Sequence, residues 1–342
     1  MGQGTFTSSS PVVSKDEETV ALQSIMRVFV PLVSLTSLVL SAVASPLNGE
    51  NFIARRDISQ DLFNDLAFYF QYAASAYADS CPKPNGNSLV LQFSQKVTDT
   101  QGFVARDDNR KEIVVSLRGS ESFTDALTDI NILLSPFLSP GVDAPLGSLA
   151  HSGFLIAWNS VAHLVISTVQ AELSAHPGYS LVSTGHSLGG ALSSLAGISL
   201  QQNFPNRRGS FLSNVRMFTY GQPRTFNPIG AAFINSQFGD QAFRSVHTTD
   251  GVPTLIPRIL GYRHHGIEYF QSPDPASPAT TKKCAADGED PTCSDSIPSQ
   301  GLDDAHGTGS VRVGTGICWE MCTALTTDNP KLQLKDVDDL LK

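Results

Sequence analysis

The feature that most constrains the fold of this chain is one short run of residues, Gly185-His186-Ser187-Leu188-Gly189. The segment before it, 179–184, reads as a short strand, and the segment after it, 191–200, reads as a helix rich in small residues. A Gly-x-Ser-x-Gly run is common by itself. Between a strand and a helix it is typical of a nucleophile elbow, a sharp turn that lifts a serine above the edge of an α/β sheet. The sequence therefore predicts that Ser187 is a nucleophile and that His186 packs beside it.

The rest of the chain alternates between strand-like and helix-like segments, which predicts a mostly parallel sheet with helices on both faces. Together with the elbow, this pattern favours the α/β-hydrolase fold. An Asp57…Gln60 capping pattern opens the first helix. The segment 271–300 is rich in Pro, Ser, Asp and Lys, so we expect a loop there. The expected helices are 57–77, 154–175 and 191–200, and the expected strands are 102–105, 112–117, 179–184, 215–220 and 242–247.

A serine hydroxyl attacks an ester only with the help of a base that is itself held by an acid. In the α/β-hydrolase fold the acid follows the serine in sequence and the histidine comes last. Asp250 follows the 242–247 strand, where a turn can project a carboxylate, although an aspartate before glycine also occurs as a simple turn residue. His306 lies in a late loop, so we predict Asp250 as the acid and His306 as the base. The other downstream histidines, which fall in a strand or a turn, are His247, His264 and His265.

The first 56 residues read as sorting and processing signals. Residues 26–44 combine a basic start, an apolar run and a small-residue cleavage pattern, which predicts a secretory signal peptide and an extracellular protein. The apolar run is short and broken by serine and threonine, so a membrane anchor is the weaker alternative. Arg55-Arg56 is typical of a dibasic processing site, which makes 45–56 a possible propeptide and 57–342 a single mature domain. Residues 1–25 form a polar extension that fits no targeting signal.

The charge balance limits the partners of the chain. Its formal net charge is −9, whereas a nucleic-acid partner requires a basic surface. An acidic protein is also repelled at long range by anionic membranes, so any lipid contact should come from apolar surface. No motif calls for a metal or another cofactor, and nothing indicates an obligate protein partner.

Five cysteines in a secreted chain predict two disulfides and one leftover thiol. Cys284 and Cys293 are close enough in sequence to close a short loop. Cys81 lies near the mature N-terminus, and Cys318 and Cys322 lie near the C-terminus, so we expect one bond to tie the two ends together. We expect the unpaired thiol to be Cys322.

Several separate motifs in a fixed order resemble the class 3 fungal lipases, a family that also contains fungal feruloyl esterases. The resemblance runs from about Asp57 to Cys318. The motifs that carry it are Ser59-Gln60-Asp61-Leu62-Phe63-Asn64, Leu117-Arg118-Gly119-Ser120, His151-Ser152-Gly153-Phe154, 185–190, Tyr220-Gly221-Gln222-Pro223-Arg224, the segment from His247 to Pro253, and Asp304-Ala305-His306.

The resemblance implies the nucleophile at Ser187, the acid at Asp250 and the base at His306. It also implies that Ser120 and the backbone N–H of Leu188 hold the oxyanion. The family's disulfides fall on Cys81–Cys318 and Cys284–Cys293. The chain departs from the family at 122–126, which lacks the tryptophan of the lipase lid, and at 306–310, which lacks a Tyr-Phe pair after the histidine.

The segment after the oxyanion motif bears on the choice between the family's two activities. Phe123, Leu127, Ile130 and Leu134 recur at helical spacing, which predicts a short amphipathic lid helix that opens onto lipid; the same stripe could instead pack permanently on the core. We therefore predict a triacylglycerol lipase that acts on lipid or aggregated ester at an interface.

The alternative is a feruloyl esterase of plant cell-wall esters, because 250–253 and 304–306 look closer to those enzymes. A catalytically silent, lipase-like binding protein is a third reading, and the complete set of Ser187, Asp250 and His306 disfavours it.

Overall fold

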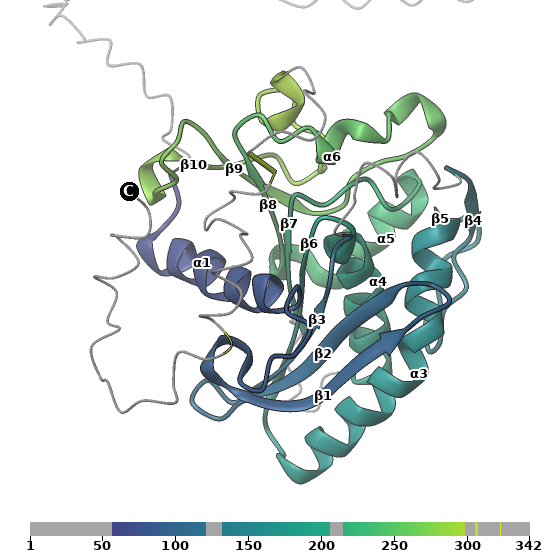
Figure 1. Ribbon diagram of the computed structural model, residues 1–342. Coiled ribbons are helices and arrows are strands. Elements are labelled where there is room, and N and C mark those ends of the chain that lie inside the picture. The colour runs from purple at the N-terminus through teal and green to yellow at the C-terminus, as the bar shows by residue number, and fades with distance from the viewer. Residues whose placement is uncertain (1–56, 121–131, 206–214, 298–304, 307–321, 323–342) are drawn as a thin grey trace, which may run out of the picture. The chain divides into compact units, whose positions relative to one another are not determined.

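The computed structural model describes residues 57–120, 132–205, 215–297, 305–306 and 322 (Figure 1). The extension 1–25, the expected signal peptide 26–44 and the expected propeptide 45–56 lie outside the described residues. So does 121–131, which holds most of the expected lid helix. The described residues belong to one compact unit of the chain, Ile53–Lys342.

The strands in the described part of the chain are β1 Ser88–Gln95, β2 Thr100–Asp107, β3 Glu112–Leu117, β4 Leu134–Pro136, β5 Leu149–His151, β6 Ser180–His186, β7 Val215–Tyr220, β8 Ala242–His247, β9 Ile267–Gln271 and β10 Thr281–Lys283. Eight of them form one sheet in the order β1-β2-β3-β6-β7-β8-β9-β10 (Figure 1). The five central strands from β3 to β9 are parallel, and the outer pairs are antiparallel. A separate antiparallel pair is formed by β4 and β5.

The α-helices of the described residues are α1 Gln60–Ser75, α3 Ser152–Ala175, α4 Leu188–Asn203, α5 Pro228–Phe238 and α6 Val252–Leu255. Helices cover both faces of the sheet, as the sequence predicts (Figure 1). Side chains alternate along each strand, so β3 sends Ile113 and Val115 into the core under α3 and α4, and Val114 into the core under α1. In the same part of the chain, five short 3₁₀ helices join these elements, at 84–86, 239–241, 258–260, 278–280 and 294–296.

By length and composition alone, α3 is the one helix in the described part of the chain that could cross a membrane. It is instead packed against the sheet and α4, because Phe154, Trp158, Val161 and Val165 lie in the core on that face. The apolar character of α3 therefore belongs to a core helix.

The structure corrects three local expectations. The N-cap of α1 is Ser59, whose hydroxyl accepts from the backbone N–H of Leu62, and Asp57 lies before the helix in a bridge with Lys282. Leu134 begins β4 and pairs with His151, so it is not part of the lid helix. The 271–300 segment, expected to be a loop, contributes β10 to the sheet. For Leu134 and for β10 a tertiary strand pairing decided what local periodicity could not, whereas the N-cap is set by the local bond from Leu62 to Ser59.

One of the two expected disulfides is confirmed and the other is wrong. Cys284 is bonded to Cys293, whereas Cys81 is bonded to Cys322, so the expectations of a Cys81–Cys318 bond and of a free Cys322 are wrong. The two candidate cysteines lie four residues apart in the C-terminal segment, and sequence spacing does not distinguish them. Because the Cα atoms of Cys81 and Cys322 are 4.9 Å apart, the pair is within the normal reach of a disulfide.

Replacing Cys322 with serine should lower the free energy of unfolding by about 2–4 kcal/mol, because the bond closes a very long loop of the unfolded chain. Cys318→Ser is the matched control and should change that free energy by less than about 0.5 kcal/mol. Urea unfolding followed by circular dichroism measures both. The pairing is contradicted if Cys318→Ser destabilises the protein and Cys322→Ser does not.

Candidate active site

Ser187 occupies the turn between β6 and α4 in a backbone conformation that few residues other than glycine adopt, with φ 60° and ψ −130°. A Cβ atom on Gly185 would collide with the carbonyl group of Gly189, and a Cβ atom on Gly189 would collide with that of Leu117. Strand and helix therefore cross closely only because both positions are glycine. The hydroxyl of Ser187 makes no capping bond to α4, which leaves it available to a side-chain partner.

The structure brings the three predicted side chains of Ser187, His306 and Asp250 together. Nε2 of His306 lies 2.9 Å from Oγ of Ser187, and Nδ1 of His306 lies 2.9 Å from Oδ1 of Asp250. A carboxylate can only accept, so Nδ1 of His306 carries the proton and Nε2 is the acceptor for the serine O–H. All three residues are buried. The arrangement can draw a proton from Ser187 and stabilise the imidazolium that forms.

Asp250 lies in a turn directly after β8. Its backbone N–H donates to the carbonyl oxygen of His247 at 3.0 Å, and its Oδ1 also accepts from the backbone N–H of Val252 at 3.0 Å. The carboxylate is thus fixed from the main chain as well as by His306. The Asp250 side chain is therefore held in one orientation, which an aspartate that only forms a turn does not require.

The segment after β7 supports the site, and sequence reasoning did not assign it a role. The carbonyl oxygen of Tyr220 accepts from the backbone N–H of Ser187 at 2.8 Å. Gly221 follows with φ +55°, and a Cβ atom there would lie 2.7 Å from Oδ2 of Asp250 and 2.9 Å from Nδ1 of His306. Gly221 therefore packs directly against the Asp250–His306 pair. In the sequence, a glycine directly after an apolar strand was the signal that could have indicated this role of Gly221.

Arg224, three residues further on, forms a buried bidentate ion pair with Glu289, with N–O distances of 2.9 and 2.7 Å. It also donates to the carbonyl oxygen of Ile256 at 2.9 Å. These charge-assisted bonds tie the segment that follows Asp250 to the disulfide loop of Cys284–Cys293. Arg224 therefore holds the chain that follows the Asp250 turn against the disulfide loop.

The two residues expected to hold an oxyanion lie beside Ser187. Leu117, at the end of β3, pairs with Gly185 of β6, and the chain continues from there to the half-buried Ser120. A Cβ atom on Gly119 would lie 3.1 Å from Cβ of Ser187, so this segment runs against the elbow. Leu188 is the first residue of α4, and its N–H is one of those that lack an acceptor within the helix.

The remaining histidines differ in their surroundings. His264 and His265 are fully buried, and burial lowers the pKa of His265 to about 3 and that of His264 well below its usual value. His264 contacts the carbonyl oxygen of Pro253, and His265 contacts Gln222, so both act in packing. His186 is more than the packing residue that we expected, since both of its ring nitrogens make hydrogen bonds.

One cluster of potential metal ligands occurs in the described ranges, formed by Glu268, Cys284 and Cys293. Both sulfurs are committed to a disulfide, and the Glu268 carboxylate is bound to Arg244 and Ser294. The group therefore offers no thiolate to an ion.

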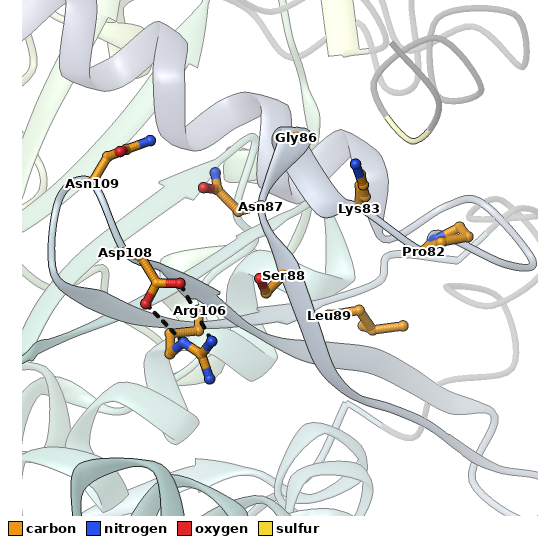
Figure 2. A pocket seen from close by; sticks show the side chains of 9 residues that line it. All are labelled: Pro82, Lys83, Gly86, Asn87, Ser88, Leu89, Arg106, Asp108 and Asn109. Atoms are coloured by element: carbon orange, nitrogen blue, oxygen red, sulfur yellow. Dashed lines mark hydrogen bonds and ion pairs between the residues drawn. The ribbon is translucent and has the colours of Figure 1, made fainter. Parts of the chain in front are cut away.

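A hollow of about 450 Å³ lies at the end of the strands opposite to the Ser187 site (Figure 2). It is lined by the end of β2 and the start of β1, and the Arg106–Asp108 ion pair closes one side. Asp107 at this end of β2 pairs with Glu112, the first residue of β3, whereas Ser187 follows the last residue of β6. Because β3 and β6 are parallel, the hollow and the Ser187 site are at opposite ends of the strands.

The sheet order, the elbow and the Ser187–His306–Asp250 set define an α/β-hydrolase. A family model described as "Lipase (class 3)" matches residues 114–259, and one described as "Lipase 3 N-terminal region" matches residues 34–100. The secreted mono- and diacylglycerol lipase 1 of Fusarium solani is 35% identical over 263 residues, which cover 70% of this chain and 74% of that protein. The chain belongs to the class 3 lipase family.

Two further comparisons agree with this assignment. A lipase of Rhizopus niveus is 35% identical over 243 residues, which cover 67% of this chain and 58% of that protein, so the chain spans little more than half of its length. The crystal structure of a triacylglycerol lipase from Penicillium expansum superposes with a TM-score of 0.68 at 30% identity, covering 75% of this chain and 96% of that one.

Replacing Gly221 with alanine should lower kcat/KM by about 100-fold, because the new methyl group displaces Asp250 or His306 by a fraction of an ångström or more. Gly239 offers a matched control. It has a similar φ of +52°, but nothing lies within 4 Å of its Cβ position.

Both substitutions should lower the free energy of unfolding by about 1–2 kcal/mol through backbone strain. Only Gly221→Ala should lower activity on a soluble ester. Equal activity losses in the two variants would show that strain alone, and not contact with the Asp250–His306 pair, explains the effect.

Proposed function

We propose that this chain is a serine esterase that hydrolyses acylglycerols, with Ser187 as nucleophile, His306 as base and Asp250 as the acid that orients the base. The observation that carries the proposal is the unbroken hydrogen-bonded series from Ser187 Oγ through the His306 ring to Asp250, with both distances at 2.9 Å. Without a base hydrogen-bonded to it, the serine hydroxyl would remain a poor nucleophile at neutral pH.

In the proposed reaction His306 takes the Ser187 proton as the hydroxyl oxygen attacks the ester carbonyl. The backbone N–H of Leu188 and Ser120 stabilise the resulting oxyanion, a type of contribution worth several kcal/mol. His306 then donates the proton to the departing alcohol, which leaves Ser187 acylated. A water molecule next gives a proton to His306 as its oxygen attacks the acyl carbonyl, the bond to Ser187 Oγ breaks, and His306 returns the proton to Oγ as the carboxylic acid is released. No step in this sequence requires a cofactor.

Two observations support a lipid substrate. The relatives are named lipases, and the Fusarium solani protein is named a mono- and diacylglycerol lipase. The chain also exposes Leu255, Ile259 and Leu260 in the segment that follows Asp250, and Leu133 just before β4. Exposed apolar side chains of this kind suit an aggregated ester better than a soluble one.

The proposal includes secretion. Residues 26–44 act as the signal peptide, and cleavage after Arg56 releases a mature domain of 57–342. Two disulfides in the described part of the chain fit an oxidising compartment, and the Fusarium solani relative is named a secreted protein.

The test compares long-chain triglyceride, above and below its solubility limit, with soluble methyl ferulate. We expect triglyceride hydrolysis with a rate increase once the lipid forms an interface, and little hydrolysis of ferulate. Activity on ferulate alone would favour the feruloyl esterase alternative and contradict the lipid proposal.

The same assay carries two variants. Ser187→Ala should lower turnover by about 10⁴-fold or more, and Ser174→Ala, at an exposed position on α3, should leave it unchanged. Substantial hydrolysis by the Ser187→Ala protein would refute the nucleophile assignment.

A further inference from the structure

His186 lies between the nucleophile and the segment that carries the base. It is the last residue of β6, it is buried, and its neighbour in the chain is Ser187. Its ring packs 4.6 Å from the ring of His306, centroid to centroid, and meets the edge of Phe70 on another side. No step of the proposed reaction uses this ring, although it touches the base.

Both nitrogens of the His186 ring have partners. Nε2 lies 2.7 Å from the backbone carbonyl oxygen of His306, and Nδ1 lies 2.9 Å from the hydroxyl of Tyr77. A carbonyl oxygen only accepts, so Nε2 of His186 carries the proton and donates it. In a neutral ring Nδ1 is then the acceptor for the Tyr77 O–H. The surroundings thus select one tautomer.

The ring also stays uncharged. Burial, together with the neighbouring His306, lowers the pKa of His186 to about 3. A positive charge on His186 would oppose the imidazolium that forms on His306 during the reaction, because like charges repel strongly inside a protein. The neutral state of His186 therefore allows His306 to gain its proton.

Tyr77 connects this pair to the oxyanion segment. A Cβ atom on Gly119 would collide with the Tyr77 hydroxyl, so the phenol lies directly against the backbone that leads to Ser120. Tyr77 follows α1, which is the helix on the opposite face of the sheet from α4. The hydrogen bonds run from Tyr77 through His186 to the main chain of His306.

We propose that His186 is a positioning residue that fixes the main chain of His306 through its Nε2–H, and so sets where the base stands relative to Ser187. This rests on the proposed function. Asp250 fixes the rotation of the His306 ring, whereas His186 fixes the backbone from which that ring extends. Displacements of about 1 Å at a reacting group can lower a rate about 100-fold.

The test compares His186→Gln with His186→Asn. A glutamine places an amide N–H four bonds from Cα, the same reach as Nε2 of histidine, whereas the amide of asparagine is one bond shorter and does not reach the His306 carbonyl. We expect His186→Gln to keep kcat within about threefold of the wild type. We expect His186→Asn to lose about 10–100-fold in kcat with KM nearly unchanged, because misplacing the base weakens stabilisation of the transition state and not binding of the substrate.

The substrate is a soluble short-chain p-nitrophenyl ester, so adsorption to lipid does not enter. His186→Leu removes both hydrogen bonds and should behave like His186→Asn. His163→Leu, the same change at an exposed position on α3, should match the wild type. Thermal unfolding of every variant checks that the protein is folded, and the Gln–Asn pair carries the test if the leucine variant is not.

Equal kcat values for His186→Gln and His186→Asn would overturn the inference, whether both are active or both are impaired. If the wild type hydrolyses no ester, the proposed function fails. If the wild type is active and the two amide variants do not differ, only the role of His186 fails.

Discussion

The backbone of Ser187 is held in a region of φ and ψ that costs about 1–3 kcal/mol for a residue with a side chain, and its neighbours maintain it there. The Ser187 N–H donates to Tyr220 of the adjacent strand, and Gly185 and Gly189 allow β6 and α4 to cross without collision. This turn aims the hydroxyl away from α4 and toward His306. The other parts of the site are arranged around that direction.

The parallel sheet explains why residues far apart in the sequence meet at this turn. β7 ends beside β6 and delivers Tyr220 and Gly221, and β8 ends next to β7 and delivers the Asp250 turn. Parallel strands end at the same edge, so each contributes its following turn to one place. His306 reaches this edge from a late segment and is held there by Asp250 and by His186.

Sequence patterns were sufficient where local chemistry decides the outcome. β7 and β8 have the expected bounds, because apolar strands flanked by turn residues leave little choice of register. The chain order of the α/β-hydrolases, the positions of Asp250 and His306 outside the strands and the family resemblance together selected the three side chains that meet in the structure. Most of the expectations that were wrong concern long-range contacts, among them Cys322 rather than Cys318 as the partner of Cys81, and Leu134 in a strand with His151. The hydrogen bonds of His186 join α1, β6 and the late segment, and no local pattern encodes them.

The central claim is that Ser187 becomes covalently modified during turnover and that His306 makes this possible. Labelling with diethyl p-nitrophenyl phosphate, followed by peptide mass spectrometry, tests it most directly, because the reagent phosphorylates an activated serine and releases nitrophenol. The expected result is one adduct, on the peptide that contains Ser187, formed in step with loss of esterase activity and lost in His306→Ala. An adduct at another serine, or full labelling of Ser187 without loss of activity, would contradict the account.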